Sequence, residues 1–275
     1  SSNTKFAFKI NKEFKLNNFD LVSKIDLDEF LFFNNLKLKK VFPKIKKNIN
    51  LSDHKLEIKY QKKQLKINGS GDVLLQNKND KLIYSITKDN NNYNFETSLK
   101  IKENPFVLDF LNYEKKENSE ILIKVDGNKK PNNKIKFNSI SLEEKDNKFN
   151  INGLALNEKR RITDLKTADI YYLDKENNKN KFKINLKNDT YYLVGSTFNA
   201  NTLIKNLINN DENDAKFIEK NFKLNIELNN LFLDKEYSLE NFKGNLLFNN
   251  QKIVNGNLIG NFFDNKKFKY TISSE

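Results

Sequence analysis

The sequence contains no cysteine, no methionine and no tryptophan, and its single histidine is His54. The absence of cysteine excludes disulfide scaffolds, Cys-ligated zinc or iron–sulfur sites and thiol catalysis. A single histidine also excludes any site that needs two imidazoles. Because the 275 residues include no initiator methionine, we expect the chain to be a fragment of a larger protein.

Glycine and proline are scarce, at 8 and 3 residues, which favours long regular strands with few sharp corners. Long hydrophobic runs are missing too. A membrane-spanning helix needs about 18 or more apolar residues, whereas the richest run covers only residues 30–33. The chain shows no signal-peptide pattern. An export signal or membrane anchor of the parent protein would therefore lie outside this piece.

Positive charge is abundant, with 49 basic against 36 acidic residues and a net charge of +13. Only Arg160 and Arg161 are arginines, although base-edge and bidentate phosphate recognition rely heavily on arginine. The lysines are spread along the whole chain. We therefore expect no nucleic-acid partner, and we interpret the lysine excess as codon bias on solvated strand faces.

Strict alternation of apolar and polar residues is the dominant pattern and predicts half-buried strands. Phe182, Ile184 and Leu186 alternate with lysine and asparagine, and similar runs recur along the chain. Clusters rich in asparagine, aspartate and glycine separate them, as at 90–92 and 126–128. These residue types tolerate the positive φ of tight hairpin turns. The pattern indicates an antiparallel meander of about 14 strands.

Helical signals are few. Asn104 and Pro105 could begin a helix through residue 111, and Asn199 could cap a helix over 200–208. A third, short polar helix is predicted for 211–220, and the conformation of 28–49 is left open. The chain therefore has two or three short helices to cover the apolar side of its strands.

So many strands at about 4.8 Å spacing would form an open sheet roughly 65 Å wide. Its apolar face must be covered by closure into a barrel, by folding into a sandwich, or by curling into a groove that holds something apolar. The low glycine and proline content favours the curled sheet. We predict a mainly β fold, a long antiparallel meander curled into an elongated groove, with residues 1–275 forming one continuous segment.

Candidate catalytic groups do not combine into an active site. Ser52, Asp53 and His54 are sequential, whereas a catalytic triad needs convergence in space. The carboxylates at 26–29 and 143–144 lack the spacing of a calcium loop. Residues 69–72 lack the lysine and helix of a phosphate-binding loop, and the lysines of 39–47 are interpreted as a solvated face. We therefore expect no enzyme, no cofactor and no metal site.

The last third carries the most distinctive motifs. A strand at 191–196 ends in small residues, and Phe198, Asn199 and Ala200 then open a short amphipathic helix. Gly-Asn-Leu steps follow at 244–246 and 256–258. This pattern resembles the AsmA-like superfamily, and most closely the YhdP- and TamB-type bridge-like lipid transfer proteins of double-membraned bacteria. The resemblance covers mainly 190–275.

The resemblance implies an internal periplasmic segment of a parent protein anchored in the inner membrane. Its function would be passive phospholipid transport between inner and outer membranes, which the parent contacts outside this segment, with acyl chains shielded in a hydrophobic β-groove. The alternative is a structural β-rich envelope or cell-surface protein with a fully packed core and no ligand. In the best-matched part, we expect the groove to be lined by Ile184, Leu186, Leu224, Ile226, Leu228, Leu246, Phe248, Leu258 and Phe268.

Overall fold

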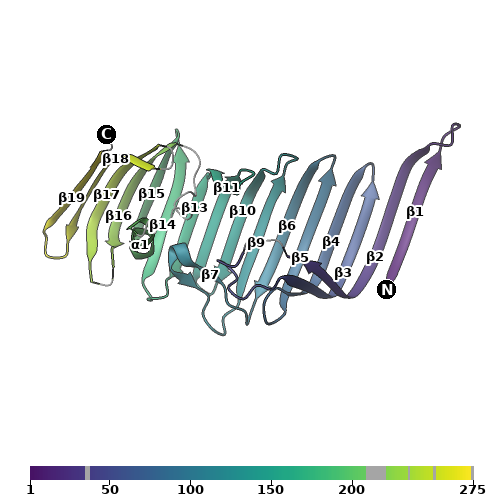
Figure 1. Ribbon diagram of the computed structural model, residues 1–275, viewed down its shortest axis with the longest axis horizontal. Helices are drawn as coiled ribbons and strands as arrows, with labels where there is room; N and C mark the ends of the chain where they lie inside the picture. Colours follow the sequence, from purple (N-terminus) through teal and green to yellow (C-terminus); the bar gives the residue numbers. More distant parts are fainter. Residues whose placement is uncertain (35–37, 209–220, 235, 250–251, 274–275) are drawn as a thin grey trace. The chain divides into compact units, whose positions relative to one another are not determined.

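The computed structural model describes residues 1–34, 38–208, 221–234, 236–249 and 252–273. As predicted, the fold is mainly β, with 69% strand and 3% helix. The chain divides into two compact units. Unit 1 comprises Ser1–Phe106 and Lys115–Asn138, and unit 2 comprises Val107–Glu114 and Ser139–Glu275. Figure 1 shows the strands of each unit lying side by side.

Unit 1 is an antiparallel arrangement in which each strand pairs with the next along the sheet. Its strands are β1 (Ser2–Ile10), β2 (Leu16–Phe33), β3 (Asn48–Gln61), β4 (Gln64–Leu74), β5 (Asp80–Asp89), β6 (Asn92–Ile101), β9 (Ile121–Lys129) and the first part of β10 (Ile135–Glu144).

The two faces of unit 1 differ as the alternation predicts. One face carries the cross-strand row Ile58, Ile67, Ile86 and Phe95. The neighbouring row on the opposite face is Glu57, Asn68, Ser85 and Glu96. On that polar face the hydroxyl of Ser85 donates to Asn68 Oδ1 at 2.9 Å. All four members of the apolar row are only partly buried.

Unit 2 contains most of the remaining strands and the α-helix. Its elements are β7 (Val107–Leu108), the 3₁₀ helix η1 (Asp109–Leu111), β8 (Tyr113–Glu114), the end of β10, β11 (Asn147–Leu156), β12 (Ile162–Asp164), β13 (Thr167–Leu173), β14 (Lys179–Lys187), β15 (Thr190–Asn199), α1 (Asn201–Ile208), β16 (Phe222–Phe232), β17 (Ser238–Asn249), β18 (Lys252–Phe262) and β19 (Lys267–Ser273).

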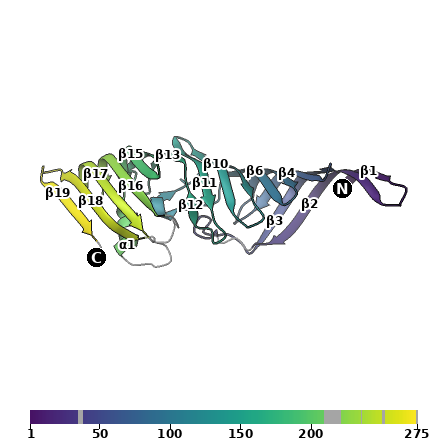
Figure 2. The same ribbon diagram turned by 90° about the horizontal axis from the view of Figure 1, so that it is seen from above.

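The prediction of a purely antiparallel meander is wrong at one place, because β15 and β16 pair in parallel. Parallel neighbours cannot be joined by a tight hairpin and need a crossover across one face of the sheet. The described part of the connection between β15 and β16 is α1. Figure 2 shows α1 on one side of these strands.

The helix predictions are only partly correct. An α-helix forms at Asn201–Ile208, close to the predicted range. The segment predicted as helical after Asn104 instead forms β7 and the single 3₁₀ turn of η1. Asn104 caps no helix, because its side chain binds the neighbouring turn, accepting from the backbone amides of Asn77 and Lys78. The predicted helix at 211–220 lies outside the described residues.

The segment left open at 28–49 also has a structure where it is described. Residues 28–33 continue β2, residues 38–47 form turns and bends, and β3 begins at Asn48. The ring of Phe42 packs edge-on against Phe106, with centroids 5.5 Å apart. The five lysines within 39–47 are exposed to solvent, in line with the solvated face predicted for them.

A buried aromatic and polar cluster lies on β8, β11 and β13 of unit 2. The ring of Tyr113 packs edge-on against Phe149 and Tyr172, with centroids 5.0 and 5.9 Å away. Its hydroxyl donates to Glu144 Oε2 at 2.7 Å, and Asn147 Nδ2 donates to the same oxygen at 2.8 Å. Burial, together with the hydrogen bond to Glu144, raises the pKa of Tyr113 above its usual range. Glu144 therefore acts as a buried hydrogen-bond acceptor within this cluster.

Candidate functional site

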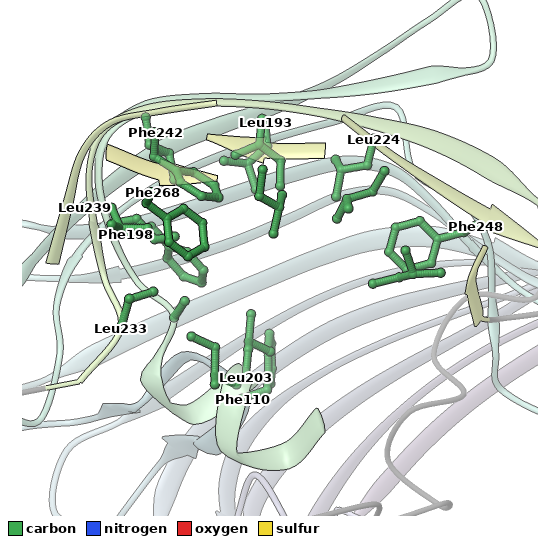
Figure 3. Close-up of a pocket in the computed structure, with 18 residues that line it drawn as sticks. Phe110, Leu193, Phe198, Leu203, Leu224, Leu233, Leu239, Phe242, Phe248 and Phe268 are labelled. Atoms are coloured by element: carbon green, nitrogen blue, oxygen red, sulfur yellow. The ribbon is translucent and has the colours of Figure 1, made fainter. Parts of the chain in front are cut away.

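An apolar cavity of about 480 Å³ lies in unit 2, between strands β15–β19 and the two helices α1 and η1 (Figure 3). All 18 residues that line it are hydrophobic: Phe110, Leu193, Phe198, Ala200, Leu203, Ile204, Leu224, Ile226, Leu228, Leu231, Leu233, Leu239, Phe242, Leu246, Phe248, Ile253, Leu258 and Phe268. Because none of these side chains can ionise, the cavity itself offers no acid, base or metal ligand.

The strand register explains why the lining is uniformly apolar. Leu193 on β15 pairs with Ile226 on β16, which pairs with Gly244 on β17 and then Leu258 on β18. These paired residues share one face, which is the face of the cavity. The next residue of each strand turns to the opposite side of the sheet.

That opposite side carries mostly polar and charged residues, with Val194, Leu247 and Ile259 as exposed apolar exceptions. Asn225, Asn245, Asn257 and Thr271 form a cross-strand row on β16 to β19, and the hydroxyl of Thr271 donates to Asn257 Oδ1 at 3.0 Å. Lys243 and Glu227 add an ion pair of 3.2 Å on the same side. The sheet therefore presents amides and charges to water on one face and only hydrocarbon to the cavity on the other.

The two Gly-Asn-Leu steps face each other across β17 and β18. Gly244 pairs with Leu258, and Leu246 pairs with Gly256. A Cβ at Gly256 would lie 2.6 Å from Leu246 Cδ2. Each glycine thus leaves room for the leucine of the other step, which keeps these leucines at the cavity wall. The Gly-Asn-Leu motif therefore has a packing role in this sheet.

Asn199 fixes the start of the helix that covers the cavity. Its Oδ1 accepts from the backbone amide of Asn201, the first residue of α1, at 3.1 Å. Its Nδ2 donates to Asp174 Oδ2 at 2.7 Å, and its own amide donates to Asn180 Oδ1 at 2.7 Å. The predicted capping residue therefore ties α1 to β14 and to the turn before it.

Phe110 reaches the cavity because η1 is held by the sheet. The hydroxyl of Tyr172 donates to the carbonyl of Leu111 at 2.8 Å, and the amide of Lys175 donates to the carbonyl of Asn112 at 2.9 Å. In Figure 3, Phe110 and Leu203 face the strand residues from the helical side of the cavity.

One part of the cavity is closed and another is open to solvent. The buried lining residues are Phe198, Ala200, Leu228, Leu231, Leu239 and Phe242. In contrast, Phe110 is 48% exposed and Leu203 is also exposed. The cavity is therefore more accessible on the side of Phe110 and Leu203 than on the side of the buried residues.

Seven of the nine residues expected to line a groove do line this cavity: Leu224, Ile226, Leu228, Leu246, Phe248, Leu258 and Phe268. Ile184 and Leu186 do not. They lie on β14 and pair with Leu193 and Tyr191 of β15, so they share the apolar face one strand beyond the cavity. The alternating pattern predicted the correct face for Ile184 and Leu186, but it could not show at which strand the cavity ends.

Several lining residues were not among those expected. Phe242 lies between polar Asn241 and Lys243, so alternation could have identified it. In contrast, Leu193 is flanked by Tyr192 and Val194 and gives no such signal. Leu203 and Ile204 belong to the apolar stripe of the predicted helix, which had not been assigned to the lining. For Phe110 the sequence offers no signal, since its position depends on contacts made far along the chain.

The other candidate groups do not form a site in the described residues. His54 is buried against Tyr84, and neither Ser52 nor Asp53 bonds to its ring nitrogens. Within the described ranges no three acidic or histidine side chains are placed to hold a metal ion. Residues 69–72 lie inside β4 beside an irregular register, rather than in a phosphate-binding loop.

Comparisons with known proteins return no relative. No protein-family model, no curated protein and no solved structure matches the chain. Among the described residues, no helix has both the length and the apolar character to cross a membrane. The geometry of the cavity is therefore the basis for a functional proposal.

Proposed function

We propose that this chain is a lipid-binding segment of a cell-envelope lipid transfer protein. The single observation that carries the proposal is the open cavity lined by 18 hydrophobic residues and no polar one. Its volume lies in the range of about 300–1,000 Å³ that is usual for ligand pockets. Its shape and lining suit a phospholipid acyl chain, with the headgroup left in water at the open side.

The energetics suit passive transfer. Moving a methylene group from water into an apolar site is worth about 0.8 kcal/mol, and a bilayer offers the same gain. A cavity whose described lining side chains are all apolar matches the bilayer without exceeding it, so in the proposal lipids enter and leave. In the proposal the half-buried apolar faces extend this site into an elongated groove. The parent protein would be anchored in the inner membrane and span the periplasm.

The experiment that tests the proposal is lipid extraction from gently purified protein, combined with binding of a fluorescent fatty acid. We expect co-purified phospholipid and saturable probe binding. Ile226→Asp places a carboxylate in the middle of the cavity wall and should abolish probe binding while the protein stays folded. Asn225→Asp is the matched control, because the same new charge lies on the polar face of the same strand.

Two results would reject lipid binding. One is the absence of both phospholipid and probe binding in the wild-type chain, which would favour the structural β-rich protein with no ligand. The other is undiminished probe binding in a folded Ile226→Asp variant, which would place the probe outside the cavity. Circular dichroism of both variants shows whether the sheet is retained.

A further inference from the structure

The hairpin formed by β1 and the start of β2 ends in a rigid turn at residues 11–15. The amide of Asn11 donates to the carbonyl of Lys15 at 3.0 Å, and the amide of Phe14 donates to the carbonyl of Asn11 at 3.0 Å. Asn11 Oδ1 also accepts from the amides of Glu13 and Lys15 at 3.0 and 2.9 Å. The turn is therefore held by two backbone hydrogen bonds and by the side chain of Asn11.

This turn places Phe14 outside the core and in a backbone conformation that is unfavourable for a bulky residue. Its φ is 54°, in the left-handed region that glycine and asparagine adopt more readily than a bulky side chain. Its side chain is 91% exposed. A strained backbone and an aromatic ring in water both oppose folding, so the packing of unit 1 provides no reason for phenylalanine here. The same turn, with a positive φ at its fourth residue, recurs at 130–134, 157–161, 174–178 and 262–266, so the exposed ring rather than the backbone distinguishes Phe14.

The hairpin adds further exposed hydrocarbon beside the tip. Phe6, Phe8 and Ile10 follow one another on one side of β1, all exposed, and the rings of Phe6 and Phe8 stack with centroids 6.3 Å apart. These residues alternate with Lys5 and Lys9.

The charge of this segment is strongly one-sided. Residues 1–15 carry four lysines and a single acidic residue, Glu13. Glu13 itself forms an ion pair with Lys15 at 2.8 Å. Asp20 and Asp26 lie farther from the tip, on the part of β2 that pairs with β1, so the positive charge is concentrated around Phe14.

We propose that this hairpin docks on an anionic lipid surface, with Phe14 inserted at the level of the headgroups. Aromatic rings gather at that depth, and each nearby lysine gains attraction from anionic lipids. A second copy of the chain suits the surface less well, because the four lysines of residues 1–15 would repel those of the other copy. The inference concerns unit 1 alone and does not depend on the cavity of unit 2.

The test is co-sedimentation of the full 275-residue chain with vesicles of phosphatidylcholine, with and without about one quarter phosphatidylserine. We expect binding that requires phosphatidylserine and weakens as salt is raised. Phe14→Asn should reduce the affinity about tenfold without lowering stability, because asparagine tolerates the left-handed conformation. Lys12→Gln should reduce it about fivefold on the anionic vesicles only.

Ile83→Ser is the matched control, because Ile83 is 60% exposed in the middle of a strand of the same unit, away from the hairpin. It should bind vesicles like the wild type. Equal sedimentation of the Phe14→Asn and wild-type chains would overturn the inference, as would equal binding to both vesicle types. A dimer that is lost in Phe6→Ser, without vesicle binding, would assign the surface to a second copy instead.

Ile226→Asp separates this inference from lipid binding in the cavity. If the hairpin docks on vesicles, that variant should still sediment with them even after losing the fatty-acid probe. Loss of sedimentation in Ile226→Asp would mean that the assay reports lipid uptake by the cavity, and the hairpin inference would fall. Conversely, wild-type sedimentation without probe binding and without co-purified phospholipid would leave the hairpin inference standing and reject the proposed function.

Discussion

Gly244 lies directly opposite Leu258 in the β17–β18 pair, and a Cβ at Gly244 would come within 2.8 Å of Leu258 Cδ2. The leucine occupies the space that a side chain at position 244 would take. The size of residue 244 therefore controls how far Leu258 extends into the cavity, and this relationship links a glycine of the sheet to the volume of the site.

Gly244→Val should narrow the cavity by displacing Leu258. The strand backbone accepts valine well, and the displaced atom is the end of a flexible side chain, so we expect the protein to fold. The affinity for a fluorescent fatty acid should fall about tenfold, measured by titration. Asn245→Val, on the opposite face of β17, is the control and should bind normally. An equal loss of probe affinity in both variants would show that the effect does not arise in the cavity.

Asn199→Leu should destabilise unit 2 by about 2–3 kcal/mol. The change removes the bonds to Asn201 and Asp174 and leaves the buried Asp174 carboxylate with fewer donors. Urea unfolding measures the loss, and acyl-probe binding should weaken as α1 loosens over the cavity. Asn185→Ala, at an exposed position of β14, should leave both quantities within error. Unchanged stability in Asn199→Leu would refute the role of this residue in holding α1.

Asp80 gives unit 1 a pH-dependent stability. Burial raises the pKa of its carboxyl from the ordinary 3.8 to about 6, although Asn104 Nδ2 donates to it at 2.8 Å. The folded state therefore holds this proton more tightly than the unfolded chain, and this contribution to stability falls as pH rises from about 4 to about 6. Above pH 6 it is lost.

Asp80→Asn should remove this loss of stability at higher pH. Relative to the wild type, its free energy of unfolding should rise with pH and level off at about 2 kcal/mol near neutrality. The asparagine oxygen can still accept from Asn104. Urea unfolding of both proteins between about pH 4 and pH 7 provides the comparison. A difference that stays constant across this range would show that the carboxyl does not titrate with the raised pKa.

His54→Leu should stabilise unit 1. The imidazole is fully buried, and within the described residues neither of its nitrogens has a hydrogen-bond partner. A buried polar group without a partner is unfavourable, so leucine should raise the free energy of unfolding by about 1–2 kcal/mol. His54→Gln keeps a polar group in the same place and should give no gain. A less stable leucine variant would indicate that the ring is needed to fill the space beside Gly71.

The alternating pattern was sufficient to predict strands and their faces. Phe222, Leu224, Ile226 and Leu228 alternate in sequence, and all except Phe222 line the cavity. This works because successive side chains of a strand point to opposite sides, a local property of the backbone. Turn chemistry was predicted less completely, since Lys62 and Lys63 both adopt positive φ without any glycine or asparagine signal.

The helix after Asn104 and the antiparallel direction of β16 were predicted incorrectly. In the first case a buried amide binds the turn at 77–80 instead of capping a helix, a tertiary contact that outweighs local propensity. In the second, periodicity carries no information about strand direction. The parallel pairing of β15 and β16 joins segments on either side of α1 and is a tertiary contact.

The sequence by itself determined that the chain is rich in strands and which residues share an apolar face, because side-chain alternation follows from backbone geometry. It also placed the two Gly-Asn-Leu steps and the capping Asn199. Only the tertiary structure decided that α1 and Phe110 lie opposite β15–β19 and enclose a cavity there. The reason is that enclosure depends on packing between segments distant in sequence, such as Tyr172 and Leu111, which no local pattern encodes.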